Sequence, residues 1–227
     1  MATLLSIETS GPLCSLALYR ADRWFEHTQN VERMHNMVVL GMLDDLLKGA
    51  GASPGELDAI AFAAGPGSFT GIRIAAALAQ GIAFAADARV VPVSSSLALA
   101  AQAVVQLADP PSPEGILTIT RSRRDAHYLA GFQSRGGALV QVMDDVLHQG
   151  HSVPPNLPGS GWVAVGHRPE WWGLGTPAMP LLEGCVVDAG AVGRLALDAW
   201  LRGHSLDPSG ALPRYVSGDS PWRPQRG

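Results

Sequence analysis

A glycine-rich loop at residues 65–73 constrains this chain more than any other segment, because it separates an apolar strand from an alanine-rich helix. Its sequence is Gly-Pro-Gly-Ser-Phe-Thr-Gly-Ile-Arg. Glycine lets another backbone or a phosphate approach the main chain closely, and the N–H groups at a helix start favour an anion. Thr70, however, stands where a P-loop or a G-x-G-x-x-G fingerprint counted from Gly65 needs glycine. The loop therefore predicts either a phosphate contact or a tight turn that starts a buried helix.

The composition indicates an ordinary globular protein. With 227 residues, 47% of them hydrophobic, the chain can bury a core in one domain or two small ones. A formal net charge of −4 gives no basic face for binding a nucleic acid alone, so any RNA contact would be shared with a partner. Cys14 and Cys185 are far apart, which indicates neither a disulfide framework nor a thiolate metal site. We expect a cytoplasmic protein with no membrane contact, since the apolar run at 74–86 reads as too short and interrupted to span a bilayer.

The order of predicted elements favours a mixed sheet covered by helices. In the first half, strands are expected at 3–9, 13–19, 24–28, 57–64 and 90–93. Helices are expected at 32–48, at 70–86 and from a cap at 94–96 toward residue 107. Three strands followed by alternating helices and strands are typical of an α/β architecture.

Clustered prolines at 109–113 predict a domain boundary, because they cannot continue the preceding helix. We therefore expect one subdomain at 1–108 and a smaller one at 109–227. A second meander is expected at 116–142, followed by strands at 162–166 and 185–187, a helix at 192–201, and a mobile tail at 217–227.

Two helices of the first half have more apolar surface than one core stripe requires. The first has a methionine-rich side opposite its core stripe, and we expect that side to face outward. The second has a bulky side and a side of small residues that would let another helix approach closely. The hypothesis is a partner interface made by Met34, Met37, Val38, Gly41, Met42, Ile72, Ala75, Ala76, Ala79 and Ala83. In the alternative, the methionine side lies beneath the second half of the same chain.

No catalytic or metal-binding constellation stands out. His148 and His151 form an H-x-x-H without a nearby carboxylate in the sequence, and we interpret them as surface histidines. No Ser-His-Asp arrangement is supported by spacing. The sequence thus predicts no catalytic residues, no metal site and no cofactor bound by this chain alone.

Four motifs of the first half resemble the TsaB (YeaZ) family: Ile7-Glu8-Thr9-Ser10, Gly71-Ile72-Arg73-Ile74, Gln80-Gly81-Ile82-Ala83-Phe84 and Val91-Pro92-Val93-Ser94-Ser95. The resemblance implies an α/β protein of the actin/Hsp70-like (ASKHA) fold, with two mixed-sheet subdomains covered by helices. It also implies a non-catalytic paralogue of the TsaD/Kae1 carbamoyltransferase, in the bacterial machinery that makes threonylcarbamoyladenosine (t6A) beside the tRNA anticodon. The second half matches this family only loosely.

The partners implied by this resemblance are a TsaD-like catalytic subunit, bound through the N-terminal region, and a TsaE-like ATPase. The chain would self-associate as a homodimer without its partner and would meet tRNA only indirectly. ATP and Mg²⁺ would bind, if at all, at an interface shared within the complex. The TsaD/Kae1 group holds a metal with two histidines four residues apart, whereas here His35 is followed by Val39, so His35 is interpreted as a helix-flank or interface residue.

The chain departs from the family pattern at the implied nucleotide cleft. Glu8 stands where most relatives have aspartate beside a phosphate or its magnesium, and Arg121-Ser122-Arg123 aligns with an Asp-Ala-Arg run of which only Arg123 is retained. Removing the carboxylate disfavours a hard cation and makes phosphate attraction conceivable. The candidate phosphate-binding residues are Glu8, Gly65, Gly67, Arg121 and Arg123, and the alternative is a solvated basic hairpin.

Two other function classes stay open at this point. One is an actin-fold ATPase or kinase acting on its own, with a nucleotide near Glu8, Gly65, Gly67 and Arg121. The other is a homodimeric binding module unconnected with tRNA.

Overall fold

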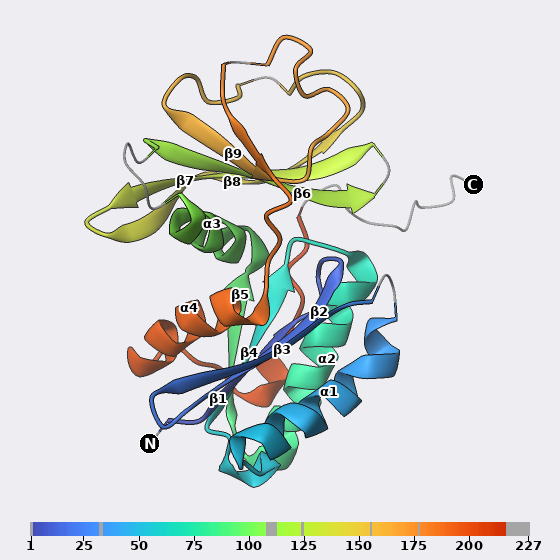
Figure 1. The fold of residues 1–227 in the computed structure, drawn as a ribbon, viewed down its shortest axis with the longest axis vertical. Helices are drawn as coiled ribbons and strands as arrows, with labels where there is room; N and C mark the ends of the chain where they lie inside the picture. Colours follow the sequence, from blue (N-terminus) through green and yellow to red (C-terminus); the bar gives the residue numbers. More distant parts are fainter. Residues whose placement is uncertain are drawn as a thin grey trace.

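The computed structural model describes residues 2–31, 34–107, 113–123, 125–154, 156–176 and 178–216. Most of the predicted boundary at 109–113 and all of the tail at 217–227 lie outside these residues. Two five-stranded sheets are stacked along the long axis of the molecule, each with helices packed against it (Figure 1).

The first sheet has the strand order β3-β2-β1-β4-β5. The chain enters it as an antiparallel meander and then adds two parallel strands, which makes the mixed sheet that the element order predicts. All residues of β1 and β4 are buried, because helices cover both faces of these central strands. The bounds are β1 (Leu4–Glu8), β2 (Leu13–Arg20), β3 (Arg23–Asn30), β4 (Ala59–Gly65) and β5 (Arg89–Ser94).

Two helices, α1 (His35–Ala50) and α2 (Phe69–Ala86), lie side by side on one face of this sheet (Figure 1). The Ser68 side chain caps α2 by accepting a hydrogen bond from the backbone N–H of Gly71 at 3.3 Å. A single 3₁₀ turn at Pro54–Glu56 follows α1 and leads into β4. The two helices and the inward side chains of β1, β2 and β4 form the larger part of the core.

The second sheet has the strand order β10-β9-β6-β7-β8. Its antiparallel part is the predicted meander, and β9 and β10 extend it in parallel. The helix α3 (Ser95–Gln106) leaves the first sheet and packs against the second (Figure 1). The bounds are β6 (Gly115–Arg123), β7 (Ala126–Arg135), β8 (Ala138–Gln149), β9 (Trp162–Gly166) and β10 (Leu181–Glu183).

The C-terminal part of the chain returns to the first sheet. The helix α4 (Ala189–Leu201) covers the face opposite α1 and α2, where Val192 and Ala196 pack on Leu4 (Figure 1). Beyond it, Leu206 bridges Val90, a 3₁₀ turn spans Pro208–Gly210, and the Arg214 N–H donates to the Ala64 carbonyl at 2.7 Å. The core of the first sheet thus includes residues from both ends of the chain, and the division at 108/109 stays a prediction.

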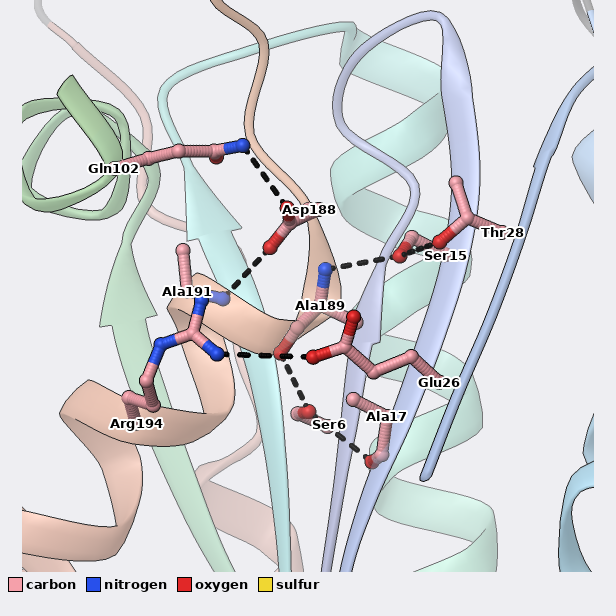
Figure 2. A network of polar contacts seen from close by, with 10 residues as sticks. All are labelled: Ser6, Ser15, Ala17, Glu26, Thr28, Gln102, Asp188, Ala189, Ala191 and Arg194. Carbon is pink, nitrogen blue, oxygen red and sulfur yellow. Dashed lines mark hydrogen bonds and ion pairs between the residues drawn. The ribbon is translucent and has the colours of Figure 1, made fainter. Parts of the chain in front are cut away.

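Figure 2 shows the polar contacts that hold the start of α4. The Asp188 carboxylate accepts from the Ala191 N–H at 2.7 Å, as a helix cap, and from Gln102 Nε2 of α3 at 2.9 Å. The Ala189 N–H donates to Ser15 Oγ at 3.0 Å, and the Ala189 carbonyl accepts from Ser6 Oγ at 2.7 Å. One turn of chain is thus tied to β1, β2 and α3 together.

The helix α2 is long and apolar enough, by length and composition, to cross a membrane. The apolar run expected at 74–86 is part of this longer helix, because α2 begins at Phe69. One face of α2 is packed against the sheet, which is how a core helix of a globular domain behaves.

We expect Asp188→Ala to lower the free energy of unfolding by about 2 kcal/mol, since it removes a helix cap and the bond to Gln102. Urea denaturation followed by circular dichroism measures this change. The matched control is Asp198→Ala in the same helix, whose carboxylate pairs with Arg202 at the exposed surface and should contribute less than about 0.5 kcal/mol. Equal effects of the two substitutions would contradict the role given to Asp188.

Candidate functional site

The glycine loop does make a close approach, but to its own chain. A Cβ on Gly67 would lie 2.7 Å from Ser10 Cβ, and one on Gly65 would lie 2.8 Å from the Arg214 carbonyl oxygen. The Ser68 N–H donates to the Ser10 carbonyl at 2.8 Å, which fixes the loop on the turn between β1 and β2. At Gly65 and Gly67 the space that a Cβ would need is therefore filled by the chain itself, and the phosphate contact stays a prediction.

Glu8 lies at the end of β1 and has no exposed surface. Its Oε1 atom accepts from the Ser10 N–H at 2.5 Å, from Ser10 Oγ at 2.7 Å and from the Gly11 N–H at 3.1 Å. Successive N–H groups of this kind form a small anion-binding concavity. Here the carboxyl group of the chain itself occupies it.

Burial raises the pKa of Glu8 to about 7, although the hydrogen bonds from Ser10 and Gly11 oppose this shift. The second carboxyl oxygen, Oε2, is buried and has no hydrogen-bond partner among the residues that the structure describes. A carboxyl group that is partly protonated at neutral pH, with one oxygen already used, is a poor ligand for a hard cation such as Mg²⁺.

The second sheet positions the predicted arginines elsewhere. Arg121 is exposed near the end of β6 and lines a pocket of about 480 Å³ with His127, His167 and Trp171. Arg123 is exposed at the end of the same strand. Within the described ranges, no hydrogen bond or ion pair joins Arg121 to Glu8, whose bonds all come from the β1–β2 turn. The five candidate phosphate-binding residues are therefore not assembled by these contacts into one site.

The apolar surface of α1 faces outward, as its methionine-rich side predicts, with one correction. Met34 and Met37 are 57% and 76% exposed, Gly41 is exposed and Val38 is half-buried. Met42 is buried in the core, because it lies on the side of α1 that contacts the sheet. Leu40, which the sequence did not single out, is 60% exposed.

For α2 the exposed side is opposite to the expected one. The small side faces the sheet, because short side chains let the helix axis approach the strands closely. Its core residues are Ile72, Ala75, Ala76, Ala79 and Ala83, all at most 3% exposed. Outward lie Ala77, Gly81 and Phe84, the last 81% exposed.

We call the combined surface the outer helix face. It consists of exposed residues from two neighbouring helices on one side of the first sheet (Figure 1). Its members are Met34, Met37, Leu40 and Gly41 of α1, and Ala77, Gly81 and Phe84 of α2. Periodicity could not show which side of α2 packs inward, since both sides are apolar.

Two histidines have the positions that the sequence predicts, a helix flank for His35 and the surface for His151, together with contacts that it does not predict. His35 is buried at the start of α1, with Nε2 3.1 Å from the Leu13 carbonyl oxygen, and so supports the fold. His151 has carboxylates nearby after all: Nδ1 is 3.0 Å from Glu170 Oε2, and Nε2 is 3.9 Å from Asp125 Oδ2. These carboxylates come from other loops, so local spacing could not reveal them.

Comparisons with known proteins agree with this architecture. The profile of the family described as "TsaD: tRNA N6-adenosine threonylcarbamoyltransferase" matches residues 27–155. The chain is 30% identical to the tRNA threonylcarbamoyladenosine biosynthesis protein TsaB of Haemophilus influenzae, over 97% of this chain and 96% of that protein. It is 32% identical to the Bacillus subtilis protein of the same name, over 63% of this chain and 60% of that one.

Solved structures give the same result. YeaZ from Pseudomonas aeruginosa superposes with a TM-score of 0.79 at 31% identity, over 95% of this chain and 100% of that chain. A second Pseudomonas aeruginosa structure, described as an uncharacterized protein with similarity to peptidase YeaZ, has a TM-score of 0.81 at 32% identity and the same coverage. The fold is thus that of YeaZ, and the two mixed sheets covered by helices agree with the expected fold class. Within that class, the chain belongs to the TsaB (YeaZ) family.

We expect the stability of the protein to fall as pH rises between about 5 and 7. The unfolded carboxyl of Glu8 loses its proton near its ordinary pKa of 4.5, whereas the folded one keeps it until about 7. The folded state binds more protons in this interval. The free energy of unfolding therefore has its full value below this interval and is lower by about 3 kcal/mol above it. Urea denaturation across this range measures the slope.

The variant Glu8→Gln should lack this component of the slope, because its amide does not titrate. Glu183→Gln, at an exposed carboxylate, should keep it. An unchanged slope in Glu8→Gln would contradict the raised pKa of Glu8.

We also expect Gly67→Ala to destabilise the protein by roughly 1–3 kcal/mol, because the added methyl group meets Ser10. Thermal denaturation measures the loss. Gly49→Ala is the control, since a Cβ there has nothing within 4 Å and alanine favours the helix. A neutral Gly67→Ala would refute the close packing of the loop on the turn.

Proposed function

We propose that this protein is a scaffold and activator subunit of the cytoplasmic complex that forms t6A in tRNA, and that it binds a TsaD-like catalytic subunit. The observation that carries the proposal is the outer helix face, on a chain that belongs to the TsaB family. Exposed apolar side chains that gather on one face of a protein usually mark a site of protein association.

The chemistry of this face suits a helical partner. Ala77 and Gly81 are small and leave room for a second helix to approach, and Phe84, one turn beyond Gly81, offers an exposed aromatic anchor. Met34 and Met37 add flexible apolar side chains that adapt to a partner surface. Asp44 and Lys48 pair at the exposed end of α1 and form a polar border.

A non-catalytic role is supported by the first sheet. Glu8 is enclosed by Ser10 and Gly11, and the glycine loop is packed on its own chain. In our proposal the partner transfers the threonylcarbamoyl group, and this chain stabilises the active conformation of that partner. ATP and Mg²⁺ would bind at an interface shared within the complex, where a TsaE-like ATPase is recruited.

The net charge of −4 supports an indirect contact with tRNA, made through the partner. Without the partner, the same face would pair with a second copy of this chain, as a homodimer. The competing function, an ATPase or kinase acting alone, requires binding of ATP and Mg²⁺ by the isolated chain. Isothermal titration with both should detect no binding, and turnover of ATP by the isolated chain would favour the competing function.

The main test is the double substitution Met37→Asp with Phe84→Glu. Both side chains are exposed, so the variant should fold, and two buried charges should weaken association by at least ~30-fold, or about 2 kcal/mol. Pull-down with the TsaD-like protein and assay of t6A in a reconstituted mixture measure the effect. Substituting Ala79 would not test the interface, because Ala79 lies in the core.

The matched control is Leu201→Asp. Leu201 is 69% exposed at the end of α4, on the opposite side of the first sheet. This control should keep both association and t6A formation. If Met37→Asp with Phe84→Glu associates as well as the unchanged chain, the outer helix face is not the interface.

A further inference from the structure

The pocket near Arg121 lies at the carboxyl ends of the parallel strands of the second sheet. β6 and β9 run parallel, and the pocket is lined by residues that follow or end both of them, among them Arg121 and His167. In sheets with parallel strands, ligands bind outside the carboxyl ends of these strands. This position makes the pocket a candidate ligand site that is separate from the outer helix face.

Three side chains at this pocket offer ligand atoms to one point. Asp125 belongs to the turn between β6 and β7, His151 follows β8, and Glu170 follows β9. One ligand atom from each lies within 4.8 Å of the other two. His151 Nδ1 is already 3.0 Å from Glu170 Oε2.

The backbone holds the three positions. Asp125 has a left-handed conformation with φ of 58°, and its carbonyl accepts from the Gly150 N–H at 2.8 Å, which brings the following residue, His151, beside it. Glu170 precedes Trp171, which is only 1% exposed and anchors that loop in the core. One half-buried and two exposed side chains therefore present ligand atoms close enough to surround one ion after small rotations.

Two further histidines lie at the same pocket. His127 is only 5% exposed and has Nε2 3.2 Å from His167 Nδ1. The other ring nitrogen of His127, Nδ1, is buried and has no hydrogen-bond partner in the part of the chain that the structure describes. Buried polar nitrogens without a partner are rare, so this wall of the pocket is unusually polar for a buried site.

We propose that Asp125, His151 and Glu170 bind a divalent transition-metal ion of the zinc class. One imidazole nitrogen and two carboxylate oxygens form a ligand set that suits Zn²⁺ and leaves a fourth position open. The two carboxylates balance the charge of the ion. Arg121 and Arg168 on the same wall repel a cation, so we expect weaker binding than at a structural zinc site.

The test is isothermal titration of the untagged full chain with ZnCl₂, together with metal analysis after dialysis. One ion should bind per chain. His151→Ala and Glu170→Gln should each weaken binding roughly tenfold or more. Bound Co²⁺ should give visible absorption bands that both substitutions remove.

The matched controls are His204→Ala and Asp198→Asn, which change an exposed histidine and an exposed carboxylate that do not line the pocket. Both should bind Zn²⁺ like the unchanged chain, and circular dichroism should show all variants folded. Absence of binding at millimolar Zn²⁺, or equal binding by His151→Ala, would overturn the site. The titration needs no partner protein, so its result is independent of the proposed role in t6A formation.

Discussion

The packing of the glycine loop on the β1–β2 turn is the constraint on which the first sheet depends. Gly67 and Gly71 allow the loop to touch Thr9 and Ser10, and the same contact starts α2 in the direction that lays it on the sheet. The turn that receives the loop also binds the carboxyl of Glu8. Strand, turn, loop and helix are therefore one packed unit, and the N–H groups of Ser10 and Gly11 help to hold it together by binding Glu8.

The two faces of the first sheet are covered differently, and this difference separates stability from association. On one face α4 is tied by Asp188 and Ala189 to strands and to α3 (Figure 2). On the other, α1 and α2 bury one side of each helix and leave the outer helix face apolar and exposed. Burial of small residues in α2 makes this arrangement possible, because the helix can lie close to the strands and still present Phe84 to a partner.

Much of the fold follows from the sequence, and the failures have physical causes. Alternation of apolar residues and turn signals located both meanders, the glycine loop located the start of α2, and a cap located α3, because these signals are local. The inward side of α2 was not predictable, since Ile74 and Ala75 are both apolar and only the space above the strands decides between them. The return of α4 and the carboxylates beside His151 join residues distant in sequence, which no single spacing encodes.

The return of α4 to the first sheet also determines when this sheet can be completed during translation. Leu4, Ala61 and Val91 emerge from the ribosome long before Val192 and Ala196, their covering residues. The apolar face of the first sheet that α4 covers therefore lacks this helix until almost the whole polypeptide has been made. The first sheet therefore cannot be completed by the N-terminal half of the chain alone. If translation stalls while the second sheet is being made, the apolar strand surface stays exposed and is available for chaperones to bind.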